Sequence, residues 1–157
     1  MNIAAKAAMS FPFLACFRQD LDRYQLIFKT VVRISGRVVS MDDKIKGAVL
    51  RLTQRMKTAS PQRIAQKMGI TIHEDAGLPE AIASVLSYDG FTRVFRLDVR
   101  PVIAADEEAM QHTLAVQIAH AVLHIYQSDS RDYEQEKKEA GEFARLLLAA
   151  SGSEAKT

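Results

Sequence analysis

The sequence predicts an α+β domain in which helices pack on a small antiparallel sheet. Two observations support this class. Segments with helical spacing of apolar residues flank a short alternating strand and a hairpin. The chain has 157 residues, 48% of them hydrophobic and 25% charged, so one domain can bury a core and remain soluble.

The first forty residues differ from the rest of the chain in charge. They carry six Lys or Arg and two Asp, whereas residues 41–157 carry fifteen basic and seventeen acidic residues. Ser10 and Pro12 interrupt the apolar start, so we expect an irregular N-terminus rather than an export or lipoprotein signal. We predict that residues 1–40 are an extension that the domain does not require, residues 41–152 the domain, and residues 153–157 a tail.

Two helices are predicted at the start of the domain. Residues 42–57 form the first, because apolar residues recur there at helical spacing. About residues 61–68 form the second, since Ser60 is a suitable N-cap, Pro61 suits the first helical position and Gly69 suits the C-terminal end. The apolar residues of the first helix are Ile45, Val49, Leu52 and Met56.

The central part of the chain reads as strands. Residues 69–74, GITIHE, alternate between apolar and polar, which indicates one strand with His73 exposed on it. Residues 83–99 read as a hairpin with Asp89-Gly90 as its turn.

Two more helices are predicted after the hairpin. The acidic residues 106–108 suit the first turn of a helix that continues to about Tyr126. The residues SDSRD interrupt it, and a last helix runs from about Asp132 to Ala150, followed by a tail SGSEAKT. The apolar stripe of the last helix contains Phe143, Leu146 and Leu147.

The predicted third helix contains a stretch related to a known metal-binding motif. A zinc hydrolase of the H-E-x-x-H type places two imidazoles four residues apart on one helical face, and the glutamate takes a proton from the metal-bound water. Residues 113–124, TLAVQIAHAVLH, resemble the TLAHELGHxLLH motif of the ImmA/IrrE family of zinc metallopeptidases. Residues 139–149, EAGEFARLLLA, resemble the family's following helix, EANxFAxxLLMP.

This resemblance covers about residues 42–150 and implies a zincin-like fold. It also implies a bacterial or mobile-element regulatory setting, in which active relatives cleave helix-turn-helix repressors. The position of the H-E-x-x-H motif is taken by Val116-Gln117-Ile118-Ala119-His120.

The departures from the family pattern predict lost chemistry. Val116 replaces the first metal-binding histidine and Gln117 occupies the general-base position, whereas His120 and Glu139 match the other two ligands. An amide cannot take a proton at neutral pH, and general-base assistance is typically worth ~10²–10⁴ in rate. We therefore expect hydrolysis to be absent or severely weakened.

Two interpretations of the remaining histidines stay open. His120 and His124 are four residues apart, so with Glu139 they would form a zinc site displaced by one turn. Ala121 follows His120, so this register also lacks a base. In the other interpretation, which we favour, His120 hydrogen-bonds Glu139 within the helix packing and His124 lies near the surface.

The function predicted from these residues is regulatory. We expect a catalytically degenerate metallopeptidase-like domain that binds a protein partner such as a helix-turn-helix repressor. The alternatives are a weak or atypical zinc metallopeptidase and a small DNA-binding regulator that uses residues 42–68. Direct nucleic-acid binding is not expected, because the basic residues of those two helices are few: Arg51, Arg55, Lys57, Arg63 and Lys67.

The expected setting of the protein is the cytoplasm. The single cysteine, Cys16, cannot form an internal disulfide, which fits a reducing compartment. No apolar run approaches the roughly 20 residues that span a bilayer, so no membrane association is expected.

Overall fold

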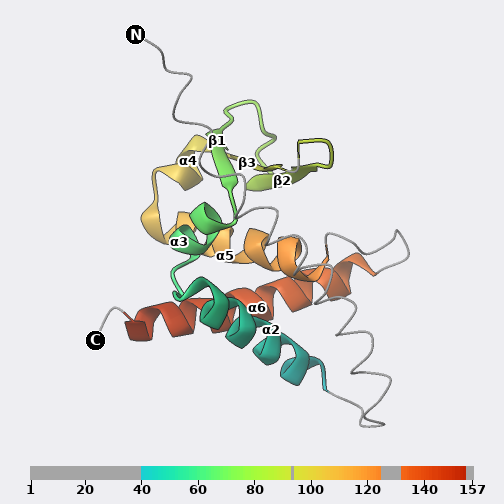
Figure 1. Cartoon of the computed structure of the whole chain (residues 1–157). Coiled ribbons are helices and arrows are strands. Elements are labelled where there is room, and N and C mark those ends of the chain that lie inside the picture. Colours follow the sequence, from blue (N-terminus) through green and yellow to red (C-terminus); the bar gives the residue numbers. More distant parts are fainter. Residues whose placement is uncertain (1–39, 93, 125–131, 155–157) are drawn as a thin grey trace. The chain divides into compact units, whose positions relative to one another are not determined.

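The computed structural model describes residues 40–92, 94–124 and 132–154 (Figure 1). The chain divides into two units between Ser40 and Met41, and the second unit is the one described below. The interpretation of residues 1–40 as an extension lies outside the described residues and stays a prediction. The described residues form five helices and a sheet of three strands. The helices are α2 (Met41–Met56), α3 (Pro61–Lys67), α4 (Pro101–Ala104), α5 (Glu107–Leu123) and α6 (Tyr133–Glu154).

The signals that predicted α3 are confirmed. Ser60 is the N-cap, and its hydroxyl accepts from the backbone N–H of Arg63 at 3.5 Å. Pro61 opens the helix, and Gly69 follows it with φ 70°, a conformation that glycine adopts without strain. The short helix α4 is not predicted from the sequence, in which Pro101 suits the end of the hairpin. In the structure, Pro101 is the first residue of this helix.

The last helix is longer than the sequence predicts. It continues to Glu154, beyond the predicted end at Ala150, so the residues SGSE extend the helix. The hydroxyl of Ser153 donates to the carbonyl of Ala150, which keeps the serine compatible with helical backbone.

The sheet is mixed, so the prediction of an antiparallel sheet is wrong for one of its strands. The strands are β1 (Ile70–Glu74), β2 (Ser84–Asp89) and β3 (Val94–Val99), in the spatial order β1-β3-β2. The hairpin of β2 and β3 is antiparallel as predicted, but β1 pairs with β3 in parallel. Of the three strands, β3 has the most buried side chains, and it is the central strand of the sheet. Because β1 lies beside β3 and not beside β2, the chain crosses over between β1 and the hairpin.

The hairpin turn is also longer than the predicted two residues. Asp89 is the last residue of β2, and β3 begins at Val94. The carboxylate of Asp89 accepts from the backbone N–H of Phe91 at 2.8 Å and from the hydroxyl of Thr92 at 2.6 Å. These bonds lower the pKa of Asp89, that to Thr92 contributing most, so the carboxylate that shapes the loop is ionised at neutral pH.

Helix α5 lies between the sheet and α6 (Figure 1). Its buried residues are small or branched: Leu114, Ala115, Ile118, Ala119 and Ala121. The sheet contributes Phe95, Leu97 and Val99 to the core, and α6 contributes Ala140, Phe143, Ala144 and Leu147. Because α5 lies between these two layers, polar side chains of α5 and its C-cap have hydrogen-bond partners both on the sheet and on α6.

The structure contains no candidate membrane span in the part of the chain that it describes. None of the helices there combines the length and apolarity needed to cross a lipid bilayer.

Candidate functional site

Gln117, which the resemblance predicts at the general-base position, is hydrogen-bonded to the sheet. The side-chain amide of Gln117 on α5 donates from Nε2 to the hydroxyl of Ser84 at 3.0 Å. Ser84 is the first residue of β2, an edge strand, and both side chains are half-buried. The sequence did not point to Ser84, because a contact between residues this far apart has no signature in local spacing.

The two histidines of α5 are joined to each other and to α6. Nδ1 of His120 lies 3.1 Å from Nδ1 of His124, and Nε2 of His124 lies 3.1 Å from Oε2 of Glu139. His124 is 8% exposed and therefore belongs to the buried part of this contact. The favoured interpretation of the sequence, with His120 on Glu139 and His124 near the surface, is wrong.

The reversal follows from the end of α5. His124 is the C-cap residue, with φ −120° and ψ −16°, so its side chain leaves the direction that a regular helix would give it. At that point the side chain of His124 reaches Glu139, in the first third of α6. His120 is one turn further from the helix end, and among the described residues its hydrogen-bond partner is the ring of His124.

The contacts continue from Glu139 to the first helix of the unit. The side-chain amide of Gln135 donates from Nε2 to Oε1 of Glu139 at 2.9 Å and lies 2.7 Å from Sδ of Met41. We call His120, His124, Glu139 and Gln135 the histidine–glutamate relay. It links α5 to α6, and Met41 brings α2 to the same point.

The relay holds a proton between two ring nitrogens. A carboxylate only accepts hydrogen bonds, so Nε2 of His124 donates to Glu139. The two Nδ1 atoms then share one proton, carried by His120 when His124 is neutral and by His124 when it is charged. Chemically, the arrangement can orient and exchange a proton.

The environment keeps His120 neutral. Burial lowers the pKa of His120 below its ordinary value, and the neighbouring ring of His124 lowers this pKa further. The carboxylate of Glu136 acts in the opposite direction and is the smallest of the three effects. A neutral His120 can act in either direction, because with its hydrogen on Nδ1 it donates to His124 and with its hydrogen on Nε2 it accepts through Nδ1.

The donors of the relay do not fit a zinc ion in this arrangement. Zinc needs its protein ligands to converge on one point at about 2.0–2.2 Å. His124 instead turns one ring nitrogen to His120 and the other to Glu139, so these two partners lie on different edges of its ring. Over residues 40–92, 94–124 and 132–154, no group of three or more His, Cys, Asp or Glu is placed to hold a metal ion. The assignment of His120, His124 and Glu139 as ligands stays a prediction.

Two other residues singled out in the sequence have identifiable surroundings. His73 is exposed on β1 as predicted, with Nδ1 3.4 Å from Oδ1 of Asp98. Lys67, one of the basic residues of the DNA-binding alternative, donates from Nζ to the carbonyl of Met56 and so caps the end of α2.

The resemblance to the ImmA/IrrE family rests on short sequence motifs. The matching positions are those of His120 and Glu139 and the apolar residues around them. Searches against protein-family models, curated proteins and solved structures find no match to this chain.

Proposed function

We propose that this chain is a catalytically degenerate, zincin-like relative of ImmA/IrrE metallopeptidases that acts in regulation by binding a protein partner, such as a helix-turn-helix repressor. One observation carries the proposal. Gln117 stands at the position of the general base, and its amide is engaged with Ser84 on the edge strand. An amide in this place cannot accept a proton from water at neutral pH, so the hydrolytic step has no base.

The relay supports a structural role for the positions that bind metal in the active relatives. Each hydrogen-bonding group of His124 has a partner, and the ring is buried. A buried polar side chain whose hydrogen-bonding groups are all satisfied fixes the packing of the elements that it joins. On this proposal, His120 and Glu139 hold α5 against α6 and no longer serve chemistry.

The exposed apolar side chains support partner binding. Five of the seven large apolar side chains that are exposed among the described residues lie between residues 72 and 102. Phe91 is 97% exposed on the hairpin loop, where Asp89 fixes the backbone. A rigidly displayed aromatic side chain is a typical anchor of protein interfaces. The other four are Ile72, Ile82, Val85 and Val102.

The proposal is tested with a helix-turn-helix repressor from the same genome, chosen first from the genes that lie beside that of this protein. The full chain is mixed with the purified repressor, complex formation is measured by calorimetry, and the repressor's intact mass is recorded after incubation with zinc. We expect a stoichiometric complex and an uncut repressor. A cleaved repressor would overturn the loss of catalysis, and the absence of a complex would overturn the choice of partner.

A matched pair of variants locates the contact. Phe91→Ser removes the exposed aromatic ring of the hairpin, whereas Tyr133→Ser removes a ring that is 72% exposed at the start of α6. We expect only the first to weaken the complex, by about tenfold or more. Equal effects of the two would show that the hairpin is not part of the contact.

A further inference from the structure

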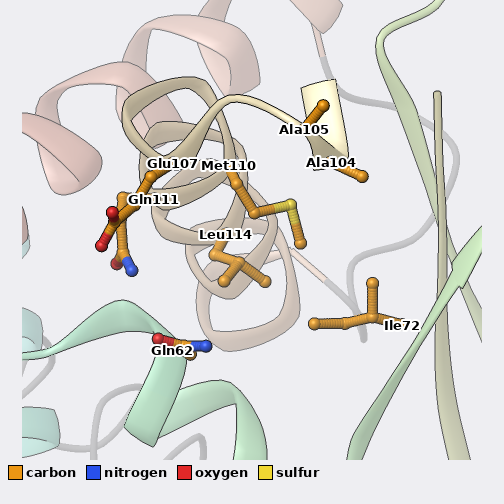
Figure 2. A pocket seen from close by; sticks show the side chains of 8 residues that line it. All are labelled: Gln62, Ile72, Ala104, Ala105, Glu107, Met110, Gln111 and Leu114. Atoms are coloured by element: carbon orange, nitrogen blue, oxygen red, sulfur yellow. The ribbon is translucent and has the colours of Figure 1, made fainter. Parts of the chain in front are cut away.

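A groove lies beside β1, and Gln117 is not among the residues that line it. It has a volume of about 260 Å³ and is open to solvent. Figure 2 shows Ile72 projecting from β1 toward Met110 and Leu114, with the side chains of Glu107 and Gln111 farther from the strand. The groove is therefore apolar next to the strand and polar at its far end. Its remaining lining residues are Gln62, Ala104 and Ala105.

The sheet is open along this groove. In the order β1-β3-β2, β1 pairs only with β3, and its outer row of backbone groups has no partner among the described residues. Ile72 pairs with Leu97 and shares its face of the sheet, yet Ile72 is 45% exposed whereas Leu97 is 0% exposed. The inner face of the sheet is therefore less completely covered at β1 than at β3.

The geometry favours an extended polypeptide over a small molecule. Pockets for small ligands usually have volumes of about 300–1,000 Å³, and this groove is smaller. An open strand edge presents a row of N–H and C=O groups, which an extended peptide satisfies by adding a strand. Such a strand lies about 4.8 Å beyond its neighbour, so one of its inward side chains would lie over the groove.

The residues that line the groove favour one kind of side chain in the added strand. Glu107 is the only charged residue of the groove, and no ion pair engages it within the described part of the chain. A side chain with an apolar stem and a cationic head matches a groove that is apolar near β1 and acidic beyond it. Arginine fits better than lysine, because its five donors can serve the carboxylate of Glu107 and the amide oxygens of Gln111 and Gln62 together.

We infer that the free edge of β1 binds an extended segment of a partner protein as a fourth strand, and that the groove takes one arginine side chain of that segment. The inference rests on the proposed function in that the partner is a protein. It concerns a different surface from the degenerate site, because Gln117 contacts β2 at the opposite edge of the sheet.

The probe is a library of random ten-residue peptides displayed on phage and selected on the full chain. We expect the enriched sequences to share an arginine within an alternating, β-prone stretch. A synthetic peptide of the enriched sequence should shift the backbone amide resonances of residues 70–74. Its counterpart with glutamate in place of arginine should bind at least tenfold more weakly.

A matched pair of variants tests the groove itself. Glu107→Gln removes the charge from the lining, whereas Glu108→Gln removes the neighbouring charge, which is exposed and does not line the groove. We expect the first to weaken peptide binding about tenfold and the second less than twofold. Circular dichroism verifies that both variants fold.

Several results would overturn this inference. They are enrichment of peptides without a basic residue, enrichment of apolar residues at helical spacing, no enrichment at all, or equal effects of the two variants. If the chain binds the repressor and neither variant changes that binding, the groove is not the site of contact, and the proposed function still stands. Arginine peptides bound at β1 by a chain that ignores the repressor would overturn only the choice of partner.

Discussion

The ring of His124 is the centre of the histidine–glutamate relay, and replacing it with phenylalanine should destabilise the fold. His124→Phe keeps a ring of similar size in the buried position but removes both hydrogen bonds. A bond to a charged group contributes about 1.5–3 kcal/mol and a neutral one about 0.5–1.5 kcal/mol. The side chain of Glu139 is 19% exposed and keeps its bond from Gln135, so the lower halves of these ranges apply. We expect a loss of about 2–3 kcal/mol in the free energy of unfolding.

Urea denaturation of the full chain at neutral pH, followed by far-ultraviolet circular dichroism, measures this loss. With a slope of about 1–3 kcal/mol per molar urea, the midpoint should fall by about 0.7–3 M. The control is His73→Phe, because the side chain of His73 is 60% exposed on β1 and its replacement should change stability by at most about 0.5 kcal/mol. Equal midpoints for the two variants would refute the reasoning, since the relay would then contribute nothing.

Three further outcomes follow from the same structure. The pKa of His120 is lowered in the folded state. As pH falls below about 6.5, this imidazole is therefore protonated in the unfolded state before it is protonated in the folded state. The contribution of this group to the free energy of unfolding should be complete above that pH and should decrease below it. Urea titrations at several pH values should show a smaller decrease for His120→Phe than for the parent. An equal decrease in the two proteins would show that His120 is not the group responsible. Residues 41–157 should fold alone, by circular dichroism and thermal melting; an unfolded fragment would show that N-terminal residues belong to the core. The double variant Val116→His with Gln117→Glu should bind zinc more tightly than the parent in competition with a chelator, and equal affinities would mean that His120 and Glu139 cannot converge.

The parts of the fold with local signals were predictable from sequence. Ser60, Pro61 and Gly69 mark the ends of α3 through their own backbone preferences, and the structure confirms all three. The direction of β1 was not predictable, because alternation indicates which face a residue takes and carries no information about the neighbouring strand. The four-residue helix α4 was missed, since Pro101 suits the first turn of a helix as well as the end of a strand.

Sequence identified His120, His124, Glu139 and Gln117 as members of the candidate site, but not Gln135 or Ser84, and it did not give the contacts. The spacing of His120 and His124 and the position of Glu139 identified residues that the structure brings together. Their order in the hydrogen-bond chain depends on where α5 ends, which helical periodicity cannot specify to the residue. The bond of Gln117 to Ser84 depends on how the sheet lies on α5, a tertiary feature with no local signal.

The zinc content of the purified full chain tests the central claim most directly. The claim is that Val116 and Gln117 remove a ligand and the base, and that His120, His124 and Glu139 bond to one another instead of converging on an ion. Elemental analysis after mild dialysis should find zinc far below one ion per chain. Close to one zinc per chain, lost in His120→Ala and retained in His73→Ala, would contradict the account.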